Sequence, residues 1–250
     1  MIRTQPSPVD KASLKRRGGV TNAWRELEAT RWGRLLLANV WPAYLFAMPL
    51  LVRAWNLVER TRDGLWGSSL HGQALLLEEV VTVAFLALTV LLFAVRRPVV
   101  GRHASWRGGL VALVGTFLLN VVGFLPVASS ASTEAILASS AVIVLGTLFT
   151  MWSLATLGRC FGLMPEARGL VTGGPYRWVR HPVYLGELTS ALGMLIVKPH
   201  LVIVGLYLAF VGLQYWRTLL EEEALADVFP DEYPAYRARV SRLVPGWPRS

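Results

Sequence analysis

The chain has 250 residues, of which 54% are hydrophobic and 16% are charged, and its formal net charge at pH 7 is +9. The apolar residues fall in long runs, which is typical of a polytopic membrane protein. A nucleic-acid-binding protein would need a water-exposed basic face, and the apolar content argues against one. We therefore expect an all-α, polytopic transmembrane helix bundle that lies in a lipid bilayer and binds no nucleic acid.

Residues 1–21 are expected to form a disordered basic leader. They combine two prolines and a Gly-Gly pair with several Lys and Arg residues. They lack the apolar core and small-residue cleavage site of a removable signal peptide. From Asn22 to Arg34, tryptophans and leucines alternate with charges, which predicts an interfacial helix with its tryptophans at headgroup depth. Residues 22–157 are then expected to hold this helix and four spans.

Six apolar stretches are candidate spans. A helix rises about 1.5 Å per residue and must cross about 30 Å of hydrocarbon. The last two stretches are short and are separated by Lys198-Pro199-His200, so we expect a tilted helical hairpin there and five to six spans in all. The stretches are Leu35–Val52, Ala74–Val95, Leu110–Val127, Ile136–Leu157, Tyr184–Val197 and Leu201–Trp216.

The basic residues predict the orientation of these spans. With six crossings, 21 of the 25 Lys and Arg residues share the side that holds both termini; the exceptions are Arg53, Arg60, Arg62 and Lys198. Positive charge collects on the cytoplasmic side of membrane proteins. We expect cytoplasmic N- and C-termini in a bacterial inner membrane, with the first outer loop, which carries the three arginines, as the weakest part of the topology.

Polar residues in or beside the apolar runs favour structural roles. Glu78 and Glu79 lie close enough to the outer headgroups that interfacial solvation or a structural pair is favoured over a functional site. Asn120 favours an interhelical hydrogen bond. Cys160 is the sole cysteine, so no intramolecular disulfide can form, and an inert thiol is favoured over a nucleophile. We expect no metal site.

A turn and a helix start precede the last hairpin. Gly173-Gly174-Pro175 predicts a tight turn, because glycine permits unusual backbone angles and proline then fixes one. Arg180 and His181 come directly before Pro182, which suits the first turn of a helix and leaves N–H groups that can bind an anion. Taken singly, Arg180 is also explained as a positive-inside anchor and His181 as a cap.

A second cluster follows the last apolar stretch. Glu221, Glu222 and Glu223 form either a solvated acidic face or hydrogen-bond acceptors for a ribose diol or a ligand ammonium group. Arg217, one helical turn earlier, could pair with a carboxylate through two donors. An aromatic tail of Phe229, Tyr233 and Tyr236 could cover an adenine ring or pack in the core. A helical hairpin would return both clusters to one membrane face.

The two clusters together resemble the signature of the isoprenylcysteine carboxyl methyltransferase and phospholipid methyltransferase superfamily. The resemblance covers about the last 90 residues and none of the first four spans. One departure is Pro230, where the family usually has glycine, and it affects the bend that positions the last two tyrosines. The matching residues are Thr172-Gly173 to Tyr176, Arg180-His181-Pro182, Tyr184, Gly186, Glu221-Glu222, Leu225, Phe229, Tyr233, Tyr236, Val240 and Pro245.

The resemblance implies that residues 158–250 are a catalytic membrane methyltransferase region with a cytoplasmic segment that binds S-adenosylmethionine without a Rossmann domain. It implies catalytic roles for Arg217, which would orient the acceptor, and Glu221. The cofactor-binding residues that it implies are Tyr176, Arg180, His181, Tyr184, Glu222, Tyr233 and Tyr236.

The resemblance also implies an amphiphilic methyl acceptor that enters from the membrane, with the carboxylate of an isoprenylcysteine as the first expectation. A phospholipid amine and a small thiol are alternative acceptors. Two other classes stay open: an NADPH-dependent sterol-type membrane reductase, because such reductases resemble this family in their C-terminal half, and a non-catalytic lipid-binding or scaffold protein. The oligomeric state is left open.

Overall fold

The computed structural model describes residues 2–3, 40–97, 99–102, 106–119, 122, 131–164 and 166–246. Within these residues the chain forms seven α-helices and two pairs of very short strands. The expected interfacial helix, most of the expected leader and Asn120 lie outside the described residues. The helices are α3 (Trp41–Arg62), α4 (Leu70–Val95), α5 (Trp106–Phe117), α6 (Thr133–Leu157), α7 (Pro182–Val197), α8 (Leu201–Val228) and α9 (Glu232–Arg237).

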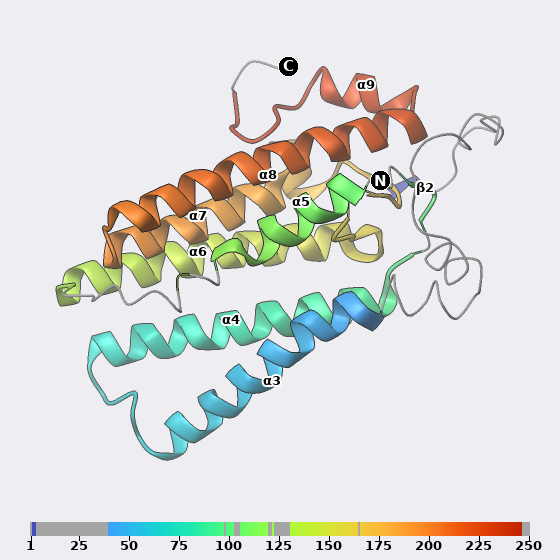
Figure 1. Cartoon of the computed structure of the whole chain (residues 1–250). Coiled ribbons are helices and arrows are strands. Elements are labelled where there is room, and N and C mark those ends of the chain that lie inside the picture. The colour runs from blue at the N-terminus through green and yellow to red at the C-terminus, as the bar shows by residue number, and fades with distance from the viewer. Residues whose placement is uncertain are drawn as a thin grey trace.

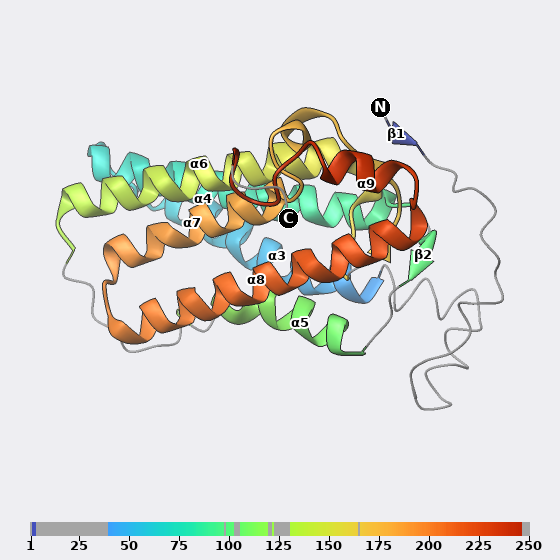
Figure 2. The same cartoon turned by 90° about the horizontal axis from the view of Figure 1, so that it is seen from above.

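The long helices run roughly along one direction, as Figure 1 shows. α3 and α4 form an antiparallel pair on one side, α4 packs on α6, and α6 packs on α7. α8 returns beside α7 and also contacts α5, an arrangement that is clear from above in Figure 2. α9 lies over the C-terminal end of α8. The bundle confirms the expected all-α, polytopic class.

Local sequence signals define where several helices begin. Ser69 and Ser132 cap α4 and α6: their hydroxyls accept hydrogen bonds from the N–H groups of Gly72 (3.1 Å) and Ala135 (3.3 Å). α7 begins at Pro182, whose fixed φ suits the first helical position. His200 caps α8 through Nδ1, which accepts a hydrogen bond from the Val202 N–H at 3.3 Å.

Three described helices are long and apolar enough to cross a membrane, namely Leu70–Val95, Thr133–Cys160 and Leu201–Val228, while Gly108–Phe117 and Pro182–Val197 are shorter apolar helices. The second and fourth predicted stretches correspond to α4 and α6. The predicted third stretch, Leu110–Val127, overlaps only α5, which ends at Phe117. The number of complete crossings stays a prediction.

Two predicted boundaries are wrong. The first stretch was expected to end at Val52, but α3 continues to Arg62, because residues 53–62 include good helix formers such as Ala, Leu, Arg and Glu. The last stretch was expected to be short and to end at Trp216, but α8 continues to Val228 and has 28 residues. That length corresponds to roughly 42 Å. Glu221–Glu223 therefore lie within α8 and do not follow its C-terminal end.

α6 and α7 approach each other closely through small residues. A side-chain carbon added to Gly186 would lie 2.2 Å from Thr150 Oγ1 and 2.8 Å from the Gly146 carbonyl oxygen. The Ser139 hydroxyl donates to the Gly193 carbonyl oxygen at 2.8 Å. Small residues that let two backbones meet are a common basis of helix packing in membranes. This interface fixes the start of α7, where the predicted site residues lie.

The acidic pair on α4 binds protein groups. Glu79 forms a 2.7 Å ion pair with Arg53 of α3, and Glu78 accepts a hydrogen bond from the Ser140 hydroxyl of α6 at 2.7 Å. Both contacts are compatible with the structural role that the sequence favours, and that role stays a prediction. The two contacts tie α4 to both of its neighbours.

Short irregular elements connect α6 to α7 at one end of the bundle. They are the 3₁₀ turns η4 (Gly158–Cys160) and η5 (Gly174–Arg177) and the strands β3 (Glu166–Ala167) and β4 (Leu170–Val171). β3 pairs with β2 (Gly101–Arg102) and β4 pairs with β1 (Ile2–Arg3), both antiparallel. η5 confirms the turn predicted at Gly173-Gly174-Pro175, with Gly174 at φ +56°. These segments cover the end of the bundle at which α7 begins.

Candidate functional site

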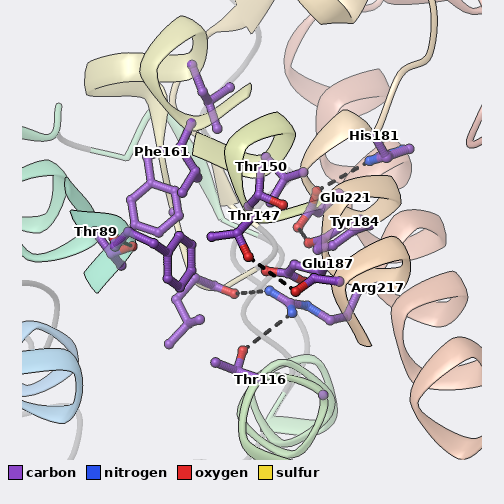
Figure 3. A pocket seen from close by; sticks show the side chains of 18 of the residues that line it. Thr89, Thr116, Thr147, Thr150, Phe161, His181, Tyr184, Glu187, Arg217 and Glu221 are labelled. Carbon is purple, nitrogen blue, oxygen red and sulfur yellow. Dashed lines mark hydrogen bonds and ion pairs between the residues drawn. The ribbon is translucent and has the colours of Figure 1, made fainter. Parts of the chain in front are cut away.

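A cavity of about 510 Å³ extends from this covered end into the space between the helices. Figure 3 shows side chains of α4, α5, α6, α7 and α8 around it. Its inner part is lined by apolar side chains of five helices, among them Phe46, Phe85, Ile143, Met194 and Phe210. Eight of the nine predicted site residues also line it: Tyr176, Arg180, His181, Tyr184, Arg217, Glu221, Tyr233 and Tyr236.

Glu222 is the predicted site residue that is not part of the cavity lining. Its carboxylate is buried and accepts hydrogen bonds from Arg180 Nε at 3.0 Å and from Arg242 Nε at 2.9 Å and Nη2 at 3.0 Å. His181 Nε2 lies 3.1 Å from the same carboxylate. Both carboxylate oxygens are thus occupied by protein donors. We call these four residues, Glu222, Arg180, His181 and Arg242, the Glu222 cluster.

The Glu222 cluster joins three chain segments that are far apart in sequence. The Arg180 and His181 N–H groups donate to the carbonyl oxygens of Ser241 (2.8 Å) and Arg242 (3.1 Å). Arg180 Nη1 donates to the Val240 carbonyl oxygen at 2.6 Å. The start of α7, the end of α8 and the C-terminal segment are therefore fixed together. The geometry indicates that Glu222 positions cavity residues without facing the cavity itself.

His181 and Tyr184 connect this cluster to Glu221. The Tyr184 hydroxyl donates to the Glu221 carboxylate, and His181 Nδ1 lies 3.6 Å from Glu221 Oε2. Burial disfavours the charged imidazole, but contacts with the carboxylates of Glu221 and Glu222 outweigh it and raise the pKa of His181. One imidazole therefore holds Glu221 on the cavity wall and links it to the Glu222 cluster.

Arg217 lies in the middle of the cavity wall, as Figure 3 shows. It is buried, and its guanidinium lies over the Tyr184 ring, 4.7 Å from the ring centroid. Nη1 donates to Gln214 Oε1 at 3.0 Å and Nη2 donates to the Leu163 carbonyl oxygen at 3.2 Å. The positive charge is thus held at a fixed place, where it can orient an anionic group that enters from the apolar part of the cavity.

Two residues that contact this region were not among the predicted site residues. Glu187 lines the cavity, and its carboxylate accepts a hydrogen bond from the Gln214 amide. Glu187 follows Tyr184 by three positions, so a helix that starts at Pro182 puts both on one face; this spacing could have indicated it. Arg242, which donates to Glu222, was also not predicted, although it lies between Val240 and Pro245 of the matching residues.

An aromatic wall closes the covered end. Phe229, Tyr233 and Tyr236 are buried together with Ala167 and Leu170. The Tyr236 hydroxyl donates to the Tyr176 carbonyl oxygen at 2.7 Å. Among the described residues, the buried Tyr233 hydroxyl has no hydrogen-bond partner, and burial raises its pKa, so it is a neutral donor. Pro230 lies in the turn between α8 and α9 and leaves both tyrosines buried.

In the described part of the chain, no group of three or more His, Cys, Asp or Glu residues is arranged to hold a metal ion. The polar residues that line the cavity are instead His181, several residues with hydroxyl groups, four glutamates and four arginines, namely Glu78, Glu166, Glu187, Glu221, Arg53, Arg168, Arg180 and Arg217. Such groups bind an organic ligand that carries both charges and an aromatic ring.

Parts of the chain are similar to known methyltransferases. Residues 135–232 match the phospholipid methyltransferase family. A methanethiol S-methyltransferase from Bradyrhizobium diazoefficiens is 40% identical over 79 residues, which cover 30% of this chain and 25% of that protein. The structure of the eukaryotic intramembrane Ras methyltransferase, isoprenylcysteine carboxyl methyltransferase, aligns over 91% of this chain and 98% of that one, with 16% identity and a TM-score of 0.41.

The family match covers α6, α7, α8 and the turn before α9, which are the elements that carry the predicted motifs. This region of the chain is therefore similar to known methyltransferases, in agreement with the resemblance that its sequence predicted. The chain spans about a quarter of the length of the curated relative that it matches.

Proposed function

We propose that this protein is an integral membrane methyltransferase that uses S-adenosylmethionine and methylates an amphiphilic acceptor. The observation that carries the proposal is one continuous cavity: its covered end holds His181, Tyr184, Glu221 and the aromatic wall, and its other part lies between apolar helix faces. A water-soluble cofactor and a membrane-borne acceptor can meet in such a space. The family match of residues 135–232 supports the same activity.

The covered end fits the cofactor. The Tyr233 hydroxyl is a buried donor whose partner is missing among the described residues, and aromatic rings beside it suit an adenine ring. Glu221 offers a carboxylate to a ribose diol or an ammonium group. Tyr176, Arg180, His181, Tyr184, Tyr233 and Tyr236 would hold the cofactor, with Glu222 acting through Arg180 and His181. Bound there, S-adenosylmethionine would supply an electrophilic methyl group.

The residues at the centre would align the acceptor. Displacement at a sulfonium methyl group needs no proton transfer when the nucleophile is a carboxylate or thiolate, so alignment and exclusion of water are the main contributions. The Arg217 guanidinium, fixed by Gln214 and Leu163, would hold the anionic end of the acceptor. Glu221 would hold the cofactor in place while the acceptor approaches its methyl group. Apolar side chains on α3, α4 and α7 would keep water out.

For the acceptor we propose first the carboxylate of an isoprenylcysteine-like molecule, because its long apolar chain suits the apolar part of the cavity and its carboxylate suits Arg217. A small thiol is the second candidate, and the 40% identity to a methanethiol S-methyltransferase favours it specifically. A phospholipid amine would need a base to take its proton, and Glu187 beside the cavity could serve.

The long apolar helices make this a membrane protein. We propose that it lies in a bacterial inner membrane with both termini in the cytoplasm, because the basic residues gather on that side of the predicted topology. The start of α7 and the Glu222 cluster would then face the cytoplasm, where S-adenosylmethionine is available.

The test is ligand stabilisation of the purified full chain in detergent. S-adenosylhomocysteine should raise the melting temperature in a concentration-dependent way, and NADPH should leave it unchanged. Stabilisation by NADPH alone would favour the reductase, and stabilisation by neither ligand in a folded sample would favour a non-catalytic lipid-binding protein. Mass spectrometry after incubation with labelled S-adenosylmethionine and an S-farnesylcysteine, an alkyl thiol or a phospholipid amine would identify the acceptor.

A further inference from the structure

Arg168 is a buried arginine on the cavity wall, in the segment between β3 and β4, and the proposed function does not use it. Its Nη1 donates to the Arg97 carbonyl oxygen, and its Nη2 donates to Glu166 Oε2 at 2.7 Å. Its Nε is also buried, and in the described part of the chain it meets no acceptor. Buried polar groups are nearly always paired, so an unpaired donor on a cavity wall needs an explanation.

A glycine lets the backbone pack closely against this Nε. A side-chain carbon added to Gly162 would lie 3.3 Å from Arg168 Nε and 3.8 Å from Arg168 Cδ. Gly162 and Arg168 both line the cavity. The next residue, Leu163, accepts the hydrogen bond of Arg217. The same short segment therefore packs against Arg168 and also accepts a hydrogen bond from the guanidinium that is proposed to orient the acceptor.

The charges around Arg168 favour an anion. The Arg97 N–H donates to the Arg159 carbonyl oxygen at 2.7 Å, and Arg159 Nε donates to the Val95 carbonyl oxygen at 3.0 Å. Arg96 lies in the same region; burial and, next, the positive charge of Arg168 lower its pKa to about 10. Four arginines thus meet at the end of α4 with Glu166 as the carboxylate that pairs with Arg168.

We propose that Arg168 Nε is the donor of an anion subsite that binds a carboxylate at the wall of the cavity. The subsite rests on the proposed function, which supplies two carboxylates: the α-carboxylate of the cofactor and, for an isoprenylcysteine-like acceptor, the carboxylate of the acceptor. Glu166 and the Arg97 carbonyl oxygen hold the other two nitrogens and aim the third. Arg168 would be a binding residue in either case.

Two variants of the full chain isolate this contact. Arg168→Lys keeps the positive charge next to Glu166 but removes Nε. Gly162→Ala leaves Arg168 intact and places a methyl group in the space beside Nε. Gly109→Ala is the matched control, because its added carbon would meet only the Met164 side chain at 3.6 Å or more. The probes are S-adenosylhomocysteine and 5′-methylthioadenosine, which share the nucleoside but differ in the carboxylate-bearing half.

We expect both test variants to weaken S-adenosylhomocysteine binding by on the order of 10-fold or more, as for loss of a hydrogen bond to a charged group, with 5′-methylthioadenosine binding unchanged. The control should bind both ligands as the wild type does. Unchanged S-adenosylhomocysteine binding with a raised KM for an S-farnesylcysteine would also support the subsite and assign it to the acceptor.

The proposal would be overturned if the variants lost affinity equally for S-adenosylhomocysteine and 5′-methylthioadenosine. It would also be overturned if they kept both the wild-type affinity and the wild-type KM. If the wild-type chain binds neither ligand, the methyltransferase function fails first, and the subsite fails with it. The comparison of variants with a binding-competent wild type therefore separates the failure of the subsite from the failure of the function.

Discussion

Glu222 of α8 and Arg180, two residues before α7, form a buried ion pair in which Arg180 Nε lies 3.0 Å from Glu222 Oε1. Arg242 and His181 share the same carboxylate. Because Glu222 faces these protein donors and not the cavity, its substitution should affect folding as well as ligand binding.

Glu222→Gln is therefore expected to destabilise the protein. Removal of one charge from a buried pair leaves its partners uncompensated and typically costs about 3–5 kcal/mol. The melting temperature in detergent should fall clearly, and S-adenosylhomocysteine affinity should fall with it. Glu223→Gln, at an exposed neighbouring position, is the control and should change stability by no more than about 0.5 kcal/mol. Wild-type stability of Glu222→Gln would show that the cluster does not join the segments.

The role of Glu222 illustrates what the sequence could predict. Residues of the site were recognisable because Arg180-His181-Pro182 and Glu221-Glu222 have a distinctive spacing, and the Lys198-Pro199-His200 break predicted the hairpin that brings them together. Which glutamate faces the cavity was not predictable. That depends on the rotation of α8, and α8 extends 12 residues beyond the end of the apolar stretch from which the hairpin was predicted.

Other features depended on long-range packing. Arg242 lies 20 residues beyond Glu222 in a segment with no helix or strand pattern, and its contact exists only because the C-terminal segment folds back over α7. Arg168 could be read as one more positive-inside residue, and only the structure shows that its Nε has no acceptor in the part of the chain that is described. By contrast, Tyr184 and Glu187 share a helix face because they are three residues apart. That pair could have been predicted from the sequence.

The close contact of α6 and α7 predicts a strong effect of Gly186→Ala. The added carbon would lie 2.2 Å from Thr150 Oγ1 and 2.8 Å from a backbone carbonyl oxygen, so the helices must separate. Overpacking of this kind costs about 1–3 kcal/mol, and the shift at the start of α7 should also weaken ligand binding. Gly205→Ala on α8 has no atom within 4 Å of its added carbon and should be neutral or slightly stabilising. Equal melting temperatures for the two variants would contradict this packing.

His181 predicts a pH dependence of stability. Its pKa is raised in the folded protein, chiefly by Glu221 and Glu222 against the effect of burial. The stabilisation by the charged imidazole is therefore fully present below the ordinary value of 6.5 and is lost as pH rises through the raised value. The difference in melting temperature between wild type and His181→Asn should shrink as pH is raised from 6. A difference that is constant or grows with pH would mean that His181 is not charged in the fold.

Arg217→Lys should lower turnover much more than cofactor affinity. Lysine keeps the positive charge but cannot contact Gln214 and Leu163 with two separate nitrogens of one plane. The acceptor would then be misaligned, which can reduce the rate on the order of 100-fold. Arg239→Lys, on the exposed side of the C-terminal segment, is the control. Wild-type turnover in Arg217→Lys would remove the proposed role, and a loss with a carboxylate acceptor but not with a thiol would identify the carboxylate as the group that Arg217 orients.

Tyr233 and Tyr236 allow a matched comparison, because both are buried in the same wall but, among the described residues, only the Tyr236 hydroxyl has a hydrogen-bond partner. Tyr236→Phe removes the 2.7 Å hydrogen bond to the Tyr176 carbonyl oxygen and should destabilise the ligand-free protein by about 1 kcal/mol. Tyr233→Phe removes a hydroxyl that has no partner among the described residues, so the ligand-free protein should be as stable as the wild type or slightly more stable.

When ligand is added, the variant that is more strongly affected should be Tyr233→Phe and no longer Tyr236→Phe. If the Tyr233 hydroxyl binds the cofactor, Tyr233→Phe should show a smaller rise in melting temperature with S-adenosylhomocysteine than either the wild type or Tyr236→Phe, corresponding to a loss of about 1 kcal/mol of binding free energy. The readout is the melting temperature of all three proteins over one ligand series. A full ligand-induced shift in Tyr233→Phe would remove this hydroxyl from the cofactor site and leave its burial without a functional reason.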